Sequence, residues 1–230
     1  MNIAMITARG GSKRIPYKNI KDFCGKPILA YSIESALQSG IFDEVMISTE
    51  DGEIARIAQD YGAAFPFKRS DRMADDHATT IDVMLEVVEC YQKLGIYPDT
   101  VCCLYPTAPF VTAQKLKDAY NLFQSSGAQA LIPIVKFSFP PQRSFVVCDG
   151  YLEFKWKEYE LSRSQDLETY YHDAGQFYMI RTDVMKREHT LVPEKTIPLI
   201  CSEMEVQDID NLEYWNIAEI KYQAMVGKKE

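Results

Sequence analysis

Residues 8–19 read Ala-Arg-Gly-Gly-Ser-Lys-Arg-Ile-Pro-Tyr-Lys-Asn and directly follow a short apolar run at residues 3–7. This segment, the basic loop, carries four cations between Arg9 and Lys18 and no acidic residue, in a chain of net charge −8. Two adjacent glycines let its backbone turn sharply and bring N–H groups close to a bound group. Amide donors and cations together suit a polyphosphate. A solvated basic turn is the alternative, but the acidic background and the position after the first strand favour phosphate binding.

The basic loop matches neither of two common nucleotide-binding motifs. A Walker A loop ends in Gly, Lys and then Ser or Thr, whereas the order here is Gly11-Ser12-Lys13. The dinucleotide fingerprint Gly-x-Gly-x-x-Gly is absent from the sequence. The sequence therefore disfavours an ATPase and a nicotinamide-dependent dehydrogenase.

The composition of the 230 residues predicts one globular domain, or one domain with an insertion. An isoelectric point near 5.0 argues against a nucleic-acid-binding protein, which needs a basic field over a whole face. No apolar run approaches the roughly 20 residues that a membrane helix needs. The six cysteines form no Cys-x-x-Cys pair, which favours free thiols in a reducing compartment. We therefore expect a cytoplasmic protein that binds neither nucleic acid nor a membrane.

Strand-like and helix-like segments alternate through the first half of the chain. Pro27 can begin a helix that stops at Gly40, and Thr112 can cap another that stops at Gly127. Extended, apolar segments are expected at residues 44–49, 65–69, 100–105, 129–135, 176–181 and 197–202. Repeated strand–helix units predict an α/β fold, with a mainly parallel sheet and helices on both faces.

The alternation stops at Pro140-Pro141, and residues 146–154 place Asp149-Gly150 between two extended runs. This is a strong β-hairpin signal. We interpret residues 137–173 as an insertion that projects from the single domain formed by residues 1–230. Apolar side chains on a projecting hairpin need a partner surface, so a dimer contact is expected. A hairpin folded onto its own domain is the alternative.

Polar loops follow several of the expected strands. In open parallel sheets, ligands bind at the carboxyl ends of strands, where strand order reverses. Asp208 and Asp210 alternate with Ile209, so in an extended segment both carboxylates point to one side. Such a pair suits Mg²⁺, which takes one or two carboxylates together with phosphate and water. The alternative for Asp210 is a capping box with Glu213 at the start of the last helix.

A second polar cluster lies late in the chain, at residues 163–167 and 172–176. Arg163 can pair with a substrate carboxylate through its guanidinium fork, although a surface ion pair explains it equally well. His172 and Asp173 are candidates for an acid and base, but two neighbouring loop residues are weak evidence for that role.

The combination of these motifs, in this order, resembles the CMP-sialic acid synthetase-like cytidylyltransferases. The matching segments are the basic loop, Gly25-Lys26-Pro27, Ser48-Thr49, Pro106-Thr107-Ala108-Pro109 and Asp208-Ile209-Asp210. Residues 163–167 and 171–178 look most like the branch that activates pseudaminic acid. The resemblance spans essentially the whole chain. It implies a Rossmann-like α/β fold with an inserted dimerisation segment at residues 137–173.

The resemblance also implies a reaction. CTP and an acidic nine-carbon 2-keto sugar give the CMP-sugar and pyrophosphate, with Mg²⁺ as cofactor, in a homodimer that serves surface glycan or flagellin glycosylation. Lys13, Lys18 and Asp208 fall on catalytic positions, and Asp208 with Asp210 on the metal ligands. The positions that match nucleotide contacts are Ala8, Arg9, Gly10, Gly11, Ser12, Lys13, Lys18, Asn19, Arg69, Thr79 and Thr80. Those assigned to the sugar are Tyr105, Arg163, Gln165, Asp166, His172 and Gln176.

Departures from the sialic acid enzymes concern the sugar. Tyr105 replaces a glutamine, and His172-Asp173-Ala174-Gly175 replaces Arg-Pro-Asn-Gly. They favour a relative of N-acetylneuraminic acid with different substituents. The other possibilities are N-acetylneuraminic, legionaminic or 3-deoxy-manno-octulosonic acid as substrate, or a non-catalytic module that binds a nucleotide sugar. The base that takes the proton of the sugar hydroxyl stays open between a side chain and metal-bound water.

Overall fold

The computed structural model describes residues 1–75 and 77–227, and its centre is a seven-stranded sheet. The strands are β1 (Asn2–Thr7), β4 (Glu44–Ser48), β5 (Thr100–Leu104), β6 (Ala130–Lys136), β9 (Tyr171–Asp173), β10 (Phe177–Arg181) and β11 (Thr196–Cys201). Their order is β11-β6-β10-β5-β1-β4, and β9 also pairs with β6. Strand β1 runs parallel to β4 and β5, whereas β10 is antiparallel to β5 and β6. The predicted mainly parallel sheet is confirmed.

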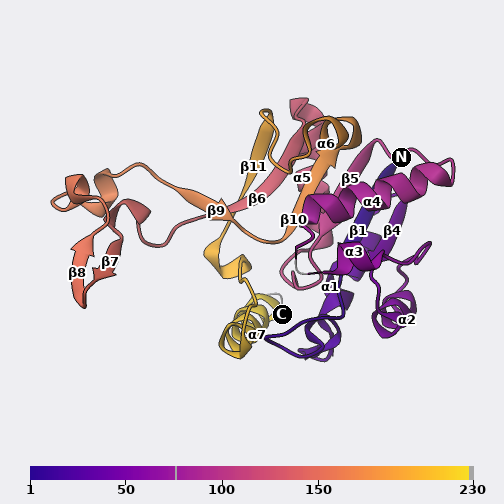
Figure 1. The fold of residues 1–230 in the computed structure, drawn as a ribbon, viewed down its shortest axis with the longest axis horizontal. Helices are drawn as coiled ribbons and strands as arrows, with labels where there is room; N and C mark the ends of the chain where they lie inside the picture. The colour runs from indigo at the N-terminus through magenta and orange to yellow at the C-terminus, as the bar shows by residue number, and fades with distance from the viewer. Residues whose placement is uncertain (76, 228–230) are drawn as a thin grey trace.

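Helices cover both faces of this sheet (Figure 1). Alternate residues of β1 enter two different cores: Ala4 and Ile6 face one, and Ile3 and Met5 face the other. The first core receives α1 (Ile28–Ser39), α2 (Gly52–Asp60) and α5 (Ala113–Ser126). The second receives α4 (Thr80–Lys93) and α6 (Thr182–Glu188). The period-two pattern of a strand thus serves two helical layers, which is the doubly covered arrangement the sequence predicts.

Local signals in the sequence begin and end these helices where expected. Gly40 closes α1 and Gly127 closes α5 in the left-handed conformation, which glycine adopts without a Cβ clash. Thr112 caps α5 by accepting a hydrogen bond from the Lys115 N–H. Thr79 and Asp82 form a reciprocal capping box at the start of α4.

The strand expected at residues 65–69 does not form. Only Ala64 makes a bridge, next to Met46 of β4, and the short helix α3 (Asp71–Ala74) follows. Pro66 has no N–H to continue a ladder, so pairing stops after Ala64. The backbone of Arg69 instead bonds to the Thr49 carbonyl beyond the end of β4. This contact brings Arg69 to the edge of the sheet where β4 ends.

The insertion leaves the sheet after β6 and carries the predicted hairpin, β7 (Phe145–Cys148) and β8 (Tyr151–Phe154). Asp149 and Gly150 both have positive φ, at 51° and 83°, as the tight turn between two twisted strands requires. Three short 3-10 segments complete it: η2 (Pro141–Arg143), η3 (Lys157–Tyr159) and η4 (Ser164–Asp166). Figure 1 shows this part extending far from the body. The last three predicted insertion residues form β9 and belong to the central sheet.

The C-terminal helix α7 (Leu212–Val226) packs beside the basic loop rather than on the main sheet. Trp215 and Ala218 of α7 share a small core with Ile15 of the loop and with Phe23. Short elements connect the basic loop to α1: η1 (Lys18–Ile20) and the two-stranded ribbon of β2 (Asp22–Phe23) and β3 (Lys26–Pro27). The short helix η5 (Glu203–Glu205) precedes α7. This core joins the basic loop to the C-terminal segment at the carboxyl edge of the sheet. No described helix is long and apolar enough to cross a bilayer.

Candidate active site

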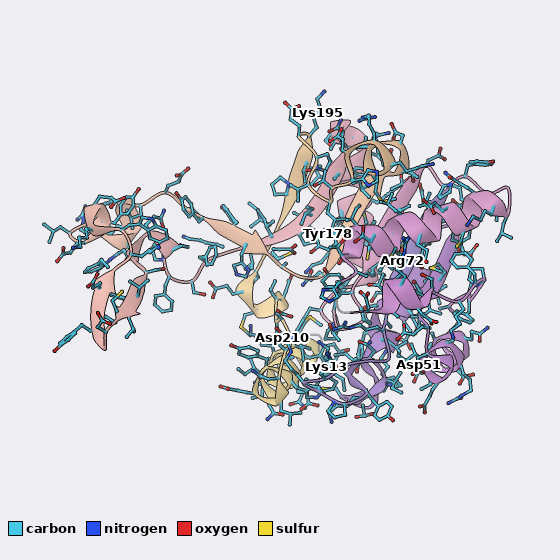
Figure 2. All side chains as sticks on the ribbon, in the orientation of Figure 1. Lys13, Asp51, Arg72, Tyr178, Lys195 and Asp210 are labelled. Carbon is cyan, nitrogen blue, oxygen red and sulfur yellow. The ribbon has the colours of Figure 1, made fainter. Side chains whose placement is uncertain are left out.

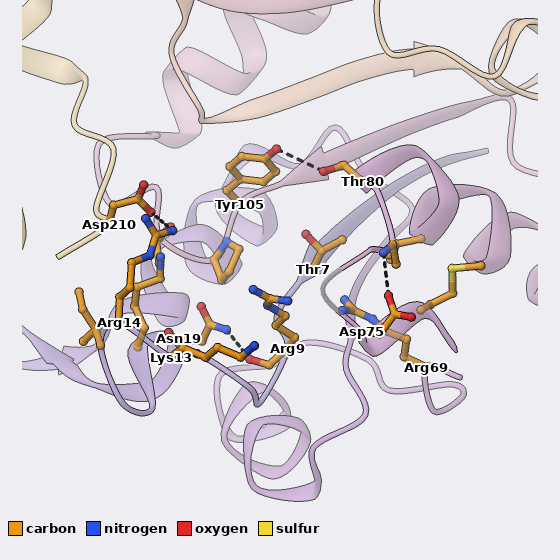
Figure 3. A pocket seen from close by; sticks show the side chains of 18 of the residues that line it. Thr7, Arg9, Lys13, Arg14, Asn19, Arg69, Asp75, Thr80, Tyr105 and Asp210 are labelled. Carbon is orange, nitrogen blue, oxygen red and sulfur yellow. Dashed lines mark hydrogen bonds and ion pairs between the residues drawn. The ribbon is translucent and has the colours of Figure 1, made fainter. Parts of the chain in front are cut away.

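A cavity of about 730 Å³, the basic cavity, opens at the carboxyl ends of β1 and β5 (Figure 3). Its lining comes from the basic loop, from the segments after β4 and β5, and from the approach to α7. The lining includes Thr7, Arg9, Ser12, Lys13, Arg14, Lys18, Asn19, Arg69, Asp75, Thr80, Tyr105, Thr107, Asp208 and Asp210. In Figure 3, Arg9 lies between Lys13 and Arg69. The predicted convergence of polar loops on one sheet edge is therefore present.

The shape of the basic loop is set by residues around it. The Asn19 side chain donates to the Arg9 carbonyl over 2.8 Å, and the Gly10 N–H donates to Glu50 Oε1 over 2.7 Å. A Cβ at position 10 would lie 2.7 Å from the Asp51 carboxylate, so any other residue requires the loop or Asp51 to shift. The acidic pair Glu50-Asp51 after β4 therefore contacts the basic loop at Gly10 and restricts its conformation. Ala8 is fully buried, and it and Gly10 lie outside the cavity lining, as does Gly11.

Hydrogen bonds within the protein fix where two cationic side chains of the cavity point. Lys18 donates from Nζ to the Ile209 carbonyl over 2.8 Å, and its burial lowers the pKa of the ammonium group against the pull of Asp210 and Asp208. Arg69 is only 5% exposed and donates from Nε to Ser48 Oγ over 3.0 Å. Burial lowers the pKa of Arg69 as well. Positive charge is therefore held inside a partly desolvated cavity, where it attracts anions more strongly than on the surface.

Asp208 and Asp210 lie on either side of Ile209, which is 1% exposed and anchored in the core of α7. Figure 2 shows Asp210 next to Lys13 beside α7, and both line the basic cavity. Asp210 forms an ion pair of 2.8 Å with Arg14. The capping role for Asp210 is wrong, because Asn211 caps α7 by accepting from the Tyr214 N–H over 2.9 Å. Both carboxylates are thus free of helix capping.

The donor set suits a magnesium ion. Among residues 1–75 and 77–227, no group of three or more His, Cys, Asp or Glu side chains forms a metal site. Asp208 and Asp210 supply two carboxylates at the wall of a cavity lined with cations. Mg²⁺ ordinarily takes one or two carboxylates and completes its shell with water and phosphate oxygens. The residues present therefore fit a metal that arrives with a phosphorylated ligand.

A second cavity, of about 670 Å³, adjoins the basic cavity. Its lining comes from β6, β9, the start of β10, η5 and α7. Within the described part of the chain, Tyr105 and Asp208 line both cavities. His172, a predicted sugar contact, lines the second one, and its ring packs against Phe137 with centroids 4.8 Å apart. The two cavities therefore meet at one aromatic hydroxyl and one carboxylate.

Two other predicted residues have structural contacts. Thr79 caps α4, whereas its neighbour Thr80 lines the basic cavity. Gln176 is buried, and its amide donates to the Glu205 carbonyl. The Glu205 carboxylate in turn pairs with Lys115 over 2.7 Å. Gln176 and Lys115 therefore fasten the segment that leads to Asp208.

Three predicted sugar contacts lie in the insertion, outside the lining of both cavities: Arg163, Gln165 and Asp166. Arg163 pairs with Asp166 over 2.7 Å, and both side chains are mainly exposed. This is the surface ion pair that the sequence left open as an alternative. Within one chain, the structure does not bring these residues to the rest of the site.

The structure adds residues that the sequence reasoning did not assign. Arg14 was visible as a cation of the basic loop, but nothing in the pattern tied it to Asp210. Tyr178 reads as one more apolar residue of a buried strand, and only its neighbours reveal a polar role. Asp173 is a candidate acid or base in the sequence, but the pattern gives it no partner other than its neighbour His172. Its contacts with Tyr178 and Gly175 come from the bend between β9 and β10.

A cavity lined with cations and two carboxylates, joined to a second cavity, is an arrangement that suits an enzyme of the nucleotidyltransferase class. The chain belongs to the cytidylyltransferase family, whose profile matches residues 3–211. It is 41% identical over 222 residues to the pseudaminic acid cytidylyltransferase of Campylobacter jejuni serotype O:2, covering 96% of each chain. It is 30% identical over 224 residues to the CMP-N,N'-diacetyllegionaminic acid synthase of Legionella pneumophila, covering 94% of each.

A solved structure shares the fold at low sequence identity. The CMP:2-keto-3-deoxy-manno-octonic acid synthetase complexed with CTP aligns with a TM-score of 0.68 at 18% identity, covering 100% of this chain and 99% of that one. The Rossmann-like α/β fold and the cytidylyltransferase activity expected from the sequence are thus confirmed.

Proposed function

We propose that this enzyme transfers the CMP group of CTP to pseudaminic acid and releases pyrophosphate. The observation that carries the proposal is the pair of adjoining cavities, one lined with cations for a triphosphate and one with mixed polar groups for a sugar acid. The 41% identity to a pseudaminic acid cytidylyltransferase over nearly the whole of both chains supports this sugar.

The triphosphate of CTP occupies the basic cavity in this proposal. Arg9, Ser12, Lys13 and Lys18 contact its phosphate oxygens, while Arg69 and Thr80 lie on the nucleoside side. Asp208 and Asp210 hold Mg²⁺, which offsets negative charge on the phosphates and on the departing pyrophosphate. Support comes from the position of both carboxylates in the wall of the basic cavity, where Asp210 pairs with the cation of Arg14.

The sugar acid occupies the second cavity. Lys136, His172 and Lys221 line it and suit the carboxylate of the sugar. The anomeric hydroxyl then reaches the α-phosphorus at Tyr105 and Asp208, where the two cavities meet. Lys13 and Lys18 orient the phosphates for this attack, and positioning with electrostatic stabilisation supplies most of the rate enhancement.

We also propose a homodimer formed through the insertion. The strands of its hairpin bury neither face within this chain, and an isolated two-stranded hairpin is marginal in water. Large apolar side chains are exposed along this part: Phe139, Phe145, Val147, Tyr151, Leu152 and Leu161. A second copy of the chain is the partner that covers them. In such a dimer, the insertion of one protomer brings Arg163, Gln165 and Asp166 to the sugar bound by its partner.

A cytoplasmic location completes the proposal. All six cysteines are free thiols, and three of them, Cys102, Cys103 and Cys201, are buried. Free thiols persist in reducing compartments.

A coupled pyrophosphate assay tests the sugar. Purified enzyme receives CTP, Mg²⁺ and one of four acids: pseudaminic, N,N'-diacetyllegionaminic, N-acetylneuraminic or 3-deoxy-manno-octulosonic. We expect the highest kcat/KM with pseudaminic acid and no pyrophosphate without a sugar. A higher value with another acid reassigns the substrate. CTP binding without release for any acid favours the non-catalytic alternative.

A further inference from the structure

A line of hydrogen bonds crosses from the basic cavity to the second cavity. Thr80 Oγ1 lies 3.3 Å from the Tyr105 hydroxyl, which lies 3.4 Å from the Tyr178 hydroxyl. Tyr178 donates to Oδ2 of Asp173, and the other carboxylate oxygen accepts from the Gly175 N–H over 2.7 Å. The two tyrosine rings pack edge to face, with centroids 5.6 Å apart. These four side chains join the nucleotide side of the site to the sugar side.

The carboxylate at one end fixes the direction of every hydrogen bond in the line. An ionised carboxylate only accepts, so the single proton of the Tyr178 hydroxyl is used on Asp173. The Tyr178 oxygen must then accept from Tyr105, which uses the single proton of Tyr105. The Tyr105 oxygen is left as an acceptor. In this structure Thr80 occupies that acceptor, at the end of the line in the basic cavity.

The acceptor stands where the reaction must occur. Tyr105 and Asp208 line both cavities among the described residues, so an attacking sugar hydroxyl and an α-phosphate meet beside them. Burial raises the pKa of both tyrosines, so neither is an anionic base near neutral pH. A neutral tyrosine in such a line can still receive one proton as it gives up another. Asp173 is exposed to the second cavity and can return a proton to water.

We propose that Tyr105, Tyr178 and Asp173 form the path that accepts the proton of the attacking sugar hydroxyl. The O–H bond of the sugar breaks as its oxygen forms a bond to the α-phosphorus, and the bond from that phosphorus to pyrophosphate breaks. The sugar proton passes to the Tyr105 oxygen, the Tyr105 proton to Tyr178, and the Tyr178 proton to the Asp173 carboxylate. Asp173 then releases it to water. Tyr105 is the catalytic residue, and the other two are positioning residues that act through it.

Other charged groups face the second cavity and are separate from this line: Lys136, His172, Glu203, Asp208 and Lys221. The His172 ring nitrogen Nδ1 lies 2.9 Å from the Asp173 main-chain oxygen, not from its carboxylate. The carboxylate of Asp173 thus contacts Tyr178 and Gly175 rather than a cation. This leaves it able to take a proton from Tyr178.

The inference rests on the proposed function and is tested by steady-state pyrophosphate release from the whole enzyme with CTP, Mg²⁺ and the sugar acid that the wild type uses. Asp173→Asn keeps the shape of the side chain but cannot take a proton. We expect kcat to fall about 100-fold, within the range of general base catalysis, with the KM for CTP unchanged. Tyr178→Phe should give a similar loss. The double variant should lose no more than either single one, because both interrupt one path.

Tyr91→Phe is the matched control. Tyr91 also donates its hydroxyl to a carboxylate, that of Glu44, but it lies outside both cavities. Its kcat should equal that of the wild type, and thermal unfolding reports whether each variant is folded. Unchanged kcat in Asp173→Asn overturns the inference, as do a raised KM for the sugar acid alone and fully additive losses in the double variant. A wild type that releases no pyrophosphate with any acid rejects the proposed function instead.

Discussion

At the scale of single residues, the site depends on cations and carboxylates that oppose one another across one cavity. Lys18 donates to the main-chain carbonyl of Ile209, between Asp208 and Asp210, so the proposed phosphate-binding cation and the proposed metal ligands share one support. Arg14 pairs with Asp210 and offsets part of the negative charge of the two carboxylates. Individual substitutions here should separate binding from turnover.

Asp208→Ala should reduce turnover by about 100-fold or more, because a metal that neutralises phosphate charge loses one of two carboxylate ligands. The measurement is pyrophosphate release at saturating CTP over a Mg²⁺ titration. Asp60→Ala, which removes an exposed partner of Arg56, is the control and should match the wild type. Unchanged release at saturating Mg²⁺ would contradict the assignment of Asp208.

Lys18→Ala should mainly raise the KM for CTP, because a phosphate contact is lost. The wild type should also show a fall in kcat/KM for CTP as pH rises. Burial lowers the pKa of Lys18 below its ordinary value of 10.5, so its ammonium loses the proton earlier than a free lysine does. Arginine stays protonated above pH 12, so Lys18→Arg should move the fall to higher pH. Identical pH profiles for the two enzymes would argue against a phosphate role.

At the scale of elements, the basic loop is shaped by the acidic pair that follows β4. The Gly10 N–H donates to Glu50, and a Cβ at this position would lie 2.7 Å from the Asp51 carboxylate. At Gly11, by contrast, a Cβ meets nothing within 4 Å. Two neighbouring glycines thus have different physical reasons to be present.

Gly10→Ala should destabilise the protein by about 1–3 kcal/mol, the usual cost of overpacking, because the loop or Asp51 must move. Thermal unfolding measures the effect, and CTP binding should weaken in the same variant. Gly11→Ala is the matched control, for which we expect the melting temperature to stay near that of the wild type. Equal melting temperatures for both variants would mean that Asp51 moves aside at little cost.

At the scale of the whole molecule, the chain divides into a body and a projecting insertion (Figure 1). The body holds both cavities, and the insertion exposes large apolar side chains. Arg163, Gln165 and Asp166 can serve the sugar only if that insertion reaches another body. The dimer and these sugar contacts therefore belong to one hypothesis.

The mass in solution at micromolar concentration should be twice 26.3 kDa, measured by light scattering after size exclusion. Val147→Asp places a charge on the hairpin, where the valine is 73% exposed, and should give a monomer. Val192→Asp, at a similarly open position (64% exposed) outside the insertion, should remain a dimer. A monomeric wild type would count against the proposal.

Local sequence patterns predict much of this fold. The apolar run before the basic loop, the caps Thr112 and Gly40, and the turn Asp149-Gly150 each predict an element that forms. These signals act over a few residues, through backbone conformation and nearby hydrogen bonds, and need no knowledge of the rest of the chain. The strand expected at residues 65–69 is wrong because its pattern was apolar while Pro66 stops the ladder. The cause of this wrong prediction is also local, because a single proline ends the strand pairing.

The sequence by itself determined the alternation of strands and helices, the charge of the basic loop and the spacing of Asp208 and Asp210. Only the tertiary structure decided what these groups face. It turned β10 antiparallel between β5 and β6 and so placed Tyr178 beside Tyr105. It buried Gln176 and left Arg163 on a remote insertion. Contacts between residues that lie tens of positions apart follow from packing of the whole chain, because no local periodicity encodes which strand becomes the neighbour of another.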